Sequence, residues 1–485
     1  MVKMKSKSKL KILILIALGI FFALSPMITV NFSFITGNSN KYLEYSDDIN
    51  LDNKNLKISA VSERIHIINN SGWVAFKNAG NCTGEGTYSD PYVIEDLVID
   101  GGGSENCIWI ENSSVYFRIE NCSISYSMIG IQLSNVNNSL IITNNCSPNN
   151  CAIYLLECNN NTLSGNTANN NFHGIYLFDS NNNTISGNTA NDNTMNGISV
   201  NYFTGIPVSG NNIIISGNTA NNNENGIFLY NSNYSTISGN TANDNTYSGI
   251  FLSGNNNIIS ENNAINNSGG ILNSVGIVVG MISNYNNTIS GNTASNNDYG
   301  IFLRGNNNTI SGNTANDNTD YGICISESSN NTILRNTANN NNYGICLEEA
   351  SDNNNITENI VNYNYLIGIY LDSSNGNIIY FNCFNNYLNA IDDGSNNHWD
   401  NGIKGNYWSD YTGSDADGDG IGDVPYKITG SAGSQDNFPL MKCPFSAQDD
   451  GGIPIELVIF ISVISGAALV SVVSILLIRH KRKRI

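Results

Sequence analysis

The feature that most constrains this chain is a short repeated sequence, in which Ile-Ser-Gly-Asn-Thr-Ala is followed after a few residues by Gly-Ile-x-Leu. One copy contains the stretch from Asn183 to Asn191, and related copies continue toward both ends. The Asn after Gly recurs at steps of 21 to 24 residues, apart from two steps of 30. Self-similarity at this period is typical of a solenoid, in which each repeat forms one coil that packs on its neighbours.

Each repeat predicts three short strands separated by polar corners. In Gly174-Ile175-Tyr176-Leu177, the Ile and the Leu are two residues apart and therefore share one face of a strand. Thr184-Ile185 and Thr189-Ala190 predict the second and third strands. The repeats lack the 3.6-residue apolar spacing of a helix, and they are crowded with Asn and Gly, which are poor helix formers. The sequence therefore predicts an all-β fold, a parallel β-helix of about 13 coils of ~22 residues.

We assign the Asn after Gly a structural role, with ligand binding as the alternative. Stacked coil on coil, its amide can hydrogen-bond to the Asn above and below, which forms an Asn ladder. At a tight corner, Asn also tolerates left-handed backbone angles. The predicted ladder comprises Asn121, Asn144, Asn166, Asn188, Asn218, Asn240, Asn262, Asn292, Asn313, Asn336, Asn359 and Asn382, with Asn406 as a further candidate.

The residue between Ile and Leu of Gly-Ile-x-Leu must point away from the core, because its neighbours point inward. Exposed aromatic rings in register would suit stacking on sugar rings. The alternative is that the rings stack on one another and stabilise the rod. Insertions at 201–210 and 267–274 flank the same sheet, and they either build a binding face or are tolerated surface loops. The ligand-binding candidates at this position are Tyr154, Tyr176, Phe228, Phe251, Phe302 and Tyr370.

An acidic segment follows the last repeat and predicts a calcium site. Asp415, Asp417, Asp419 and Asp423 occupy positions 1, 3, 5 and 9 of an EF-hand-like loop, with Gly at position 6 and Ile421 at position 7. Alternating oxygen ligands on a tightly turning backbone can surround a hard cation. Position 12 is Tyr426 rather than Glu and no helices flank the loop, so an EF-hand fold is not expected. An acidic turn without a cation is the alternative.

The two ends predict export and membrane anchoring. Lysines precede an apolar run at 12–23, as in a signal peptide, although this segment could also remain as an anchor. Residues 457–478 carry no charge, are long enough to span a bilayer, and precede a basic tail. The positive-inside rule then places the tail in the cytoplasm and the repeats outside the cell membrane. The predicted segments are 1–30 signal peptide or anchor, 31–64 flexible lead-in, 65–103 N-terminal cap with a short helix within 71–76, 104–406 repeats, 407–445 acidic segment, 446–456 linker, 457–478 transmembrane helix and 479–485 tail.

Charge and reactive residues narrow the function further. The net charge is −19, and without the two ends 11 basic residues face 39 acidic ones, so nucleic acid is not an expected partner. The four histidines are scattered, and no His, Cys or Met cluster suits copper or zinc. Cys324 and Cys346 occupy the same position of neighbouring repeats, where they form either a disulfide or two stacked free thiols.

A resemblance to known families follows from longer motifs. The repeat over residues 100–406 resembles that of right-handed parallel β-helix proteins of the pectin-lyase-like group. The segment from Gly405-Asn406-Tyr407-Trp408 to Asp419-Gly420-Ile421-Gly422-Asp423, ending in Asn437-Phe438-Pro439-Leu440-Met441, is similar to the end of NosD-type β-helix surface proteins. That resemblance implies a periplasmic role in maturing a copper enzyme, and the wider carbohydrate-binding and sugar-hydrolase group implies contact with polysaccharides. No motif here matches the catalytic residues of pectate lyases or polygalacturonases.

Three functional hypotheses remain open. The first is a membrane-anchored, non-catalytic surface protein for adhesion or binding, with glycans or surface-layer components as partners. The second is an extracellular polysaccharide lyase, hydrolase or epimerase. The third is copper-enzyme maturation, which the scarcity of histidine disfavours, so calcium is the expected cation.

Overall fold

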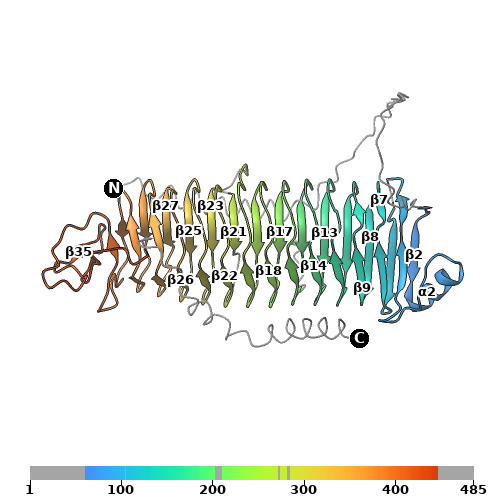
Figure 1. Ribbon diagram of the computed structural model, residues 1–485, viewed down its shortest axis with the longest axis horizontal. Coiled ribbons are helices and arrows are strands. Elements are labelled where there is room, and N and C mark those ends of the chain that lie inside the picture. The colour runs from blue at the N-terminus through green and yellow to red at the C-terminus, as the bar shows by residue number, and fades with distance from the viewer. Residues whose placement is uncertain (1–59, 104, 202–209, 271–273, 281–283, 446–485) are drawn as a thin grey trace, which may run out of the picture. The chain divides into compact units, whose positions relative to one another are not determined.

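The computed structural model describes residues 60–103, 105–201, 210–270, 274–280 and 284–445. The chain divides into two compact units, Met1–Pro444 and Phe445–Ile485, and the features below belong to the first. This unit is a parallel β-helix whose coils stack along one axis (Figure 1). The all-β solenoid predicted from the repeat period is thereby confirmed. The predicted signal segment and membrane span lie outside the described residues, and within the described residues no helix is long and apolar enough to cross a bilayer.

The first long sheet, which we call the Gly-Ile sheet, has 14 parallel strands. Neighbouring strands are successive coils, so the order along the sheet follows the chain. Its strands are β2 (Ile65–Ile68), β5 (Ile108–Ser113), β8 (Ile129–Val136), β11 (Cys151–Leu156), β13 (His173–Phe178), β15 (Asn196–Val200), β17 (Asn225–Leu229), β19 (Ser248–Leu252), β21 (Val275–Val279), β23 (Tyr299–Leu303), β25 (Tyr321–Ser326), β27 (Tyr343–Glu348), β30 (Ile367–Leu371) and β33 (Ala390–Asp392).

The second long sheet, the Ile-Ser sheet, has 13 strands in the same arrangement. Most of its strands are three residues long, because polar corners follow closely on both sides. Its strands are β3 (Tyr92–Glu95), β6 (Phe117–Glu120), β9 (Ser139–Ile142), β12 (Thr162–Ser164), β14 (Thr184–Ser186), β16 (Ile214–Ser216), β18 (Thr236–Ser238), β20 (Ile258–Ser260), β22 (Thr288–Ser290), β24 (Thr309–Ser311), β26 (Thr332–Leu334), β28 (Asn355–Thr357) and β31 (Ile378–Tyr380).

The third face of the coil is regular only near its ends. In the middle coils the predicted third strand is reduced to single bridges, such as Thr167 to Thr189. Two short strands of the C-terminal segment, β35 and β36, pair antiparallel. The remaining strands are β1 (Ala60–Val61), β4 (Leu97–Asp100), β7 (Ser123–Ser125), β10 (Asn145–Cys146), β29 (Ile360–Asn362), β32 (Cys383–Asn385), β34 (Tyr407–Trp408), β35 (Tyr426–Lys427) and β36 (Gln435–Asp436).

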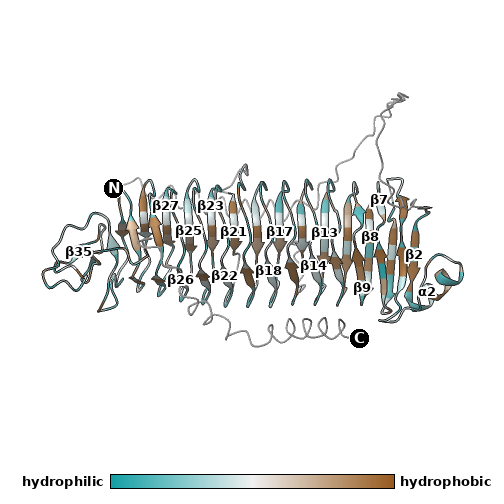
Figure 2. Ribbon diagram, in the orientation of Figure 1, coloured by the Kyte–Doolittle hydropathy of each residue, from teal (hydrophilic) through white to brown (hydrophobic). Residues whose placement is uncertain are grey.

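The core is a column of small apolar side chains repeated in every coil. In one coil these are Ile175, Leu177, Ile185 and Ala190, and each is fully buried. Figure 2 shows this pattern as apolar strand residues between hydrophilic turns. At Gly174 an added Cβ would lie 2.3 Å from the Gly197 carbonyl oxygen, so the first residue of Gly-Ile must lack a side chain for the coils to stack.

Caps close both ends of this core. At the N-terminal end, the predicted short helix is present as α2 (Asn69–Asn78). It buries Trp73, whose ring stacks on Tyr92 with centroids 5.2 Å apart. At the C-terminal end, a disulfide joins Cys383 in the last coils to Cys443. Each cap covers apolar side chains and strand edges that would otherwise face water.

The Asn ladder is present from Asn144 to Asn406. In the step from Asn240 to Asn262, the backbone N–H and the side-chain Nδ2 of Asn240 both donate to Oδ1 of Asn262, at 2.9 Å each. Every rung is at most 1% exposed, so these bonds replace water for buried polar groups. The ladder ends at Asp436, whose carboxylate accepts the N–H of Asn406 at 2.7 Å.

Two details of the predicted ladder are wrong. Asn121 is exposed and bonds to Asp96, whereas the next residue, Cys122, donates its N–H to Asn144 and occupies the position of the rung. From Asn144 to Asn382, the left-handed backbone angle also belongs to the residue before each rung rather than to the Asn. Gly usually fills that position, but Glu261 (φ 57°) and Phe381 (φ 58°) adopt the same conformation. The rung needs a buried amide, and the preceding corner needs a left-handed residue.

Two further ladders, which we did not predict, stabilise the other corners. One begins at Asn149 and passes through Asn171 and Asn193 before reaching Asn386. The other occupies the corner between the two long sheets, and Ile213 and Ser235 interrupt its row of amides. Its Asn rungs are Asn161, Asn183, Asn257, Asn287, Asn308, Asn331, Asn354, Asn377 and Asn397.

Candidate ligand-binding surfaces

The outer face of the Gly-Ile sheet carries the row of side chains singled out in the sequence. Strand register places Tyr154 opposite Tyr176, Phe228 opposite Phe251, and Phe302 opposite Val278. All six are half-buried, with the neighbouring coils covering part of each side chain. Their backbone positions therefore form one continuous column along the rod.

This row extends further toward the N-terminus than the sequence indicated. His66 pairs with Trp109, Trp109 pairs with Gln132, and Gln132 pairs with Tyr154, the first of the predicted candidates. The His66 and Trp109 rings stack with centroids 4.2 Å apart and planes 7° apart. The sequence pattern did not predict these two residues, because their strands lack the Gly-Ile-x-Leu motif of the repeat. The apolar alternation of Ile65-His66-Ile67 and Ile108-Trp109-Ile110 was the available signal.

Ring orientation decides how this row can meet a ligand. Phe228 and Phe251 stack with centroids 4.4 Å apart and planes 7° apart. Tyr154 and Tyr176 lie 5.2 Å apart with planes tilted by 32°. Stacked rings use their faces on one another, so they present edges and, for tyrosine, hydroxyls toward the solvent. The alternative of mutual stacking therefore holds for these pairs, and it limits face-on contact with sugars.

The last two positions of the row before Tyr370 are cysteines rather than aromatics. Cys324 and Cys346 are opposite each other in register, both are buried, and both are free thiols. A hydrogen bond with the Cys346 thiol, together with burial, raises the pKa of Cys324 well above its ordinary value. Tyr321 and Tyr343, stacked at 5.0 Å on the same sheet, are next to them. Of the two predicted arrangements, the structure has the stacked thiols.

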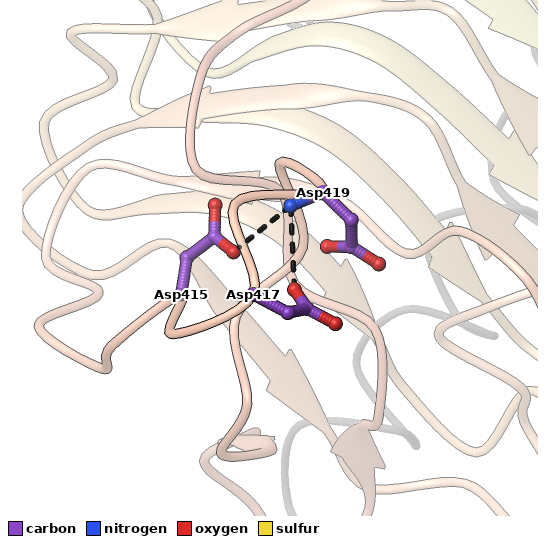
Figure 3. Close-up of side chains that lie close together, drawn as sticks. All are labelled: Asp415, Asp417 and Asp419. Carbon is purple, nitrogen blue, oxygen red and sulfur yellow. Dashed lines mark hydrogen bonds between the residues drawn. The ribbon is translucent and has the colours of Figure 1, made fainter.

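The acidic loop brings three of its carboxylates together. The ligand oxygens of Asp415, Asp417 and Asp419 lie within 4.8 Å of one another. Figure 3 shows the loop wrapping so that the Asp419 N–H points at Asp415 (3.1 Å) and Asp417 (3.3 Å). This is the one convergent group of three or more His, Cys, Asp or Glu side chains among the described residues. Oxygen donors of this kind suit Ca²⁺.

The other predicted calcium ligands are arranged differently. The Asp423 carboxylate accepts hydrogen bonds from the Ala416 N–H at 2.9 Å and the Ser414 hydroxyl at 3.1 Å, which close the loop. Ile421 donates its N–H to Asp419. Tyr426, at position 12, bonds through its hydroxyl to Asp410. The loop is thus held by its own hydrogen bonds, with Asp415, Asp417 and Asp419 as its convergent carboxylates.

Comparisons with known proteins gave several similar solved structures. Among solved structures, the chain is similar to the A-module of mannuronan C-5 epimerase AlgE6 from Azotobacter vinelandii, with 14% identity and a TM-score of 0.45 over 68% of this chain and 92% of that one. It is also similar to the Dettilon tailspike protein, with 17% identity and a TM-score of 0.42 over 60% of this chain and 62% of the tailspike. These likenesses concern the fold alone. A comparison with curated proteins gave no match.

A family model is more specific. The model described as "Periplasmic copper-binding protein (NosD)" matches residues 88–268 and 272–413. These ranges cover most of the repeats and the beginning of the acidic segment, and they make up more than half of the chain. The chain therefore belongs to the NosD family of parallel β-helix proteins.

Proposed function

We propose that this protein is a non-catalytic cell-surface binding protein whose outer Gly-Ile face holds a glycan chain along the rod. The observation that carries this proposal is the in-register row of half-buried aromatic and polar side chains. Coils repeat at ~4.8 Å, so the row offers a regular series of apolar ring edges interspersed with hydroxyl and amide groups. A polysaccharide is also a linear array of apolar C–H surfaces and hydroxyls.

The N-terminal end of the row adds a hollow of about 350 Å³. Arg64, His66, Glu105, Asn106 and Trp109 line it. Arg64 forms an ion pair with Glu105 at 2.5 Å, and the stacked rings of His66 and Trp109 give the hollow an aromatic wall. Planar guanidinium and amide groups beside an aromatic ring are suited to vicinal hydroxyls.

Membrane anchoring completes the proposal. The transmembrane segment 457–478 would hold the protein in the cell membrane, with the β-helix outside and the tail at 479–485 in the cytoplasm. The predicted signal segment, whether cleaved or retained, gives the same orientation. Ca²⁺ on Asp415, Asp417 and Asp419 would stabilise the C-terminal segment rather than take part in chemistry. Surface-layer components are further candidate partners at the same location.

Copper, which the family description names, has little support in the described residues. His66 bonds to Glu111 at 2.8 Å. His173 lies on the Gly-Ile sheet with its pKa lowered to about 4 by burial, and His398 is on the Ile-Ser sheet. The convergent group that does exist consists of three aspartates, whose hard oxygens favour Ca²⁺ or Mg²⁺ over copper. These residues do not fit a copper site, and we derive no step through the metal.

A glycan array with the purified protein tests the proposal. We expect binding that weakens at least tenfold in the Phe228→Ala/Phe251→Ala double variant, which removes the stacked pair. Tyr387→Ala is the matched control, because Tyr387 is 95% exposed and lies outside the row. No binding, or equal binding by all three proteins, would refute the Gly-Ile face. Release of reducing or unsaturated ends from a bound polysaccharide would instead support the enzymatic alternative.

A further inference from the structure

A second hollow, of about 580 Å³, lies on the outer face of the Ile-Ser sheet at its C-terminal end. Strand register places Asn355 beside Ile378, and Ile378 beside His398. Because Ile356, Ile379 and Trp399 are buried, the residues on either side of them point outward. The lining residues are Asn355, Ile378, Tyr380, His398, Asp400, Asn401 and Gly402.

The composition of this hollow departs from the rest of the sheet. At the equivalent outward positions, five of the earlier coils carry Thr and Ser, as in Thr184-Ile185-Ser186 and Thr309-Ile310-Ser311, and others carry an apolar residue such as Ile214 or Ile258 beside a serine. The last coils replace these hydroxyls with an amide, a phenol, an imidazole and a carboxylate. The repeat needs none of these groups for its corners or its core. Asp400 ties the C-terminal segment to this end of the rod, whereas no such structural role accounts for the amide, the phenol and the imidazole beside it.

Two polar atoms of this surface are buried without a partner among the described residues. They are Oδ1 of Asn355, which lines the hollow, and Oγ1 of Thr357, which is 5% exposed and lies opposite Tyr380 in register. Leaving such an atom unpaired costs ~1–3 kcal/mol. Both atoms are enclosed by protein, so a ligand would reach the Asn355 oxygen only if this half-buried side chain turned toward the hollow. A ligand hydroxyl that pairs with the turned amide would recover that cost.

The far wall is held in place by bonds that do not involve a ligand. The Asp400 carboxylate accepts the Gly402 N–H at 2.9 Å, and the N–H and Nδ2 of Asn437 at 3.0 and 2.9 Å. The side-chain oxygen of Asn401 accepts the N–H groups of Ile403 and Lys404. Because this wall is already ordered, little conformational entropy is lost there when a ligand binds.

We infer that this hollow is a binding site for one neutral sugar unit of a polysaccharide. Ile378, 40% exposed, and the half-buried Tyr380 offer an apolar floor for the ring. Asn355, His398 and Asp400 provide donors and acceptors for its hydroxyls. A neutral sugar fits better than an anionic one, because the lining contains the Asp400 carboxylate and the body of the protein is acidic. The site is on a different sheet from the proposed glycan face and stands without it.

The test is saturation-transfer NMR on the full-length protein with neutral oligosaccharides of glucose, xylose, mannose and galactose as probes. We expect at least one probe to receive saturation, with an affinity at least tenfold weaker in His398→Ala and in Asn355→Ala. Tyr380→Phe, which keeps the ring, is expected to weaken binding by less. Melting curves by circular dichroism check that each variant is folded, and His398→Ala is the variant of choice if Asn355→Ala is not.

Phe228→Ala/Phe251→Ala is the matched control, because it alters the Gly-Ile face alone. Binding lost in that control but retained in His398→Ala would overturn this inference while leaving the proposed function in place. Binding lost in His398→Ala but retained in the control would support this inference independently of the proposed function. Saturation of no probe, or tighter binding of an oligouronate than of every neutral probe, would also overturn it.

Discussion

The Asn ladder makes a quantitative prediction about the stability of the rod. Asn240→Ala removes four side-chain hydrogen bonds, all of 2.9 Å. Oδ1 of Asn240 accepts from the backbone N–H and from Nδ2 of Asn218, and Nδ2 of Asn240 donates to the Ile215 carbonyl and to Asn262. At about 1 kcal/mol net for each bond, the loss is about 4 kcal/mol.

The neighbouring rungs keep part of their bonding, which sets the range. Nδ2 of Asn218 retains the Ile185 carbonyl, and Oδ1 of Asn262 retains the Asn240 backbone N–H. The backbone N–H of Asn218 is the group left buried and unpaired, at a cost of ~1–3 kcal/mol. We therefore expect a destabilisation of about 3–5 kcal/mol.

Asn243→Ala is the matched control, three residues away on the same coil. Its side-chain oxygen accepts one bond, from the Ile265 N–H at 2.9 Å, and the residue is half-buried. The expected loss is about 1 kcal/mol. Urea unfolding followed by circular dichroism compares the two variants, and hydrogen exchange at the Asn218 amide reports the local opening that a stack of coils allows. Equal midpoints for the two variants, with the Asn218 amide still protected in Asn240→Ala, would refute the assignment of stability to the ladder.

Three further predictions concern the C-terminal segment and the thiols. Burial raises the pKa of Asp436 to about 6, above its ordinary value of 3.8, so the stability that its protonation adds is present below about pH 4 and is lost as pH rises through 6. The free energy of unfolding measured by urea titration should fall by up to about 3 kcal/mol over this window, and by less in Asp436→Asn. Calcium should bind at submillimolar concentration and raise the melting temperature, whereas Asp417→Ala should abolish both effects. The loop would be excluded as a cation site if calorimetric titration with calcium gave no heat of binding, or if the variant in calcium melted like the native protein in calcium. Iodoacetamide at pH 8 should modify the half-buried Cys82 before Cys324 and Cys346, since the latter two are buried and the pKa of Cys324 is strongly raised. Mass spectrometry of peptides over a time course measures this order, and earlier modification of Cys324 or Cys346 would contradict the prediction.

The repeat made the architecture predictable because its period, its inward Ile and Leu, and its corner Asn all constrain the same coil. The repeat pattern mispredicted the ladder at Glu120-Asn121-Cys122, where an Asn occupies the left-handed corner and a Cys occupies the position of the rung. A Gly-Asn pair marks the rung in many other copies, and this copy lacks it. The ladder through Asn149 recurs as regularly as the first, and the one through Asn161 is interrupted at Ile213 and Ser235. They were missed because their flanking residues vary more between copies.

The candidate surfaces were less accessible to sequence reasoning. The column of Phe228 and Phe251 follows from strand alternation, but the angle between their rings depends on side-chain rotamers that a pattern does not encode. The disulfide between Cys383 and Cys443 spans 60 residues and depends on how the irregular C-terminal segment folds back on the last coil. The hollow around His398 arises from positions where the repeat is no longer kept. Sequence periodicity therefore predicts the regular coils, whereas departures from it need coordinates.

The ladders also bear on how such a rod avoids joining to another copy. Each rung accepts hydrogen bonds from the coil before it and donates hydrogen bonds to the coil after it. A last rung without an acceptor could therefore donate to any copy of the protein stacked on that end. All three ladders instead finish on a carboxylate: Asn406 on Asp436, Asn397 on Asp392, and Asn386, through Asn389, on Asp410. An ionised carboxylate accepts but cannot donate. Asp410 and Asp436 belong to the C-terminal segment and Asp392 ends β33 of the last coil, and together they form a chemical terminator that would oppose head-to-tail growth of fibres.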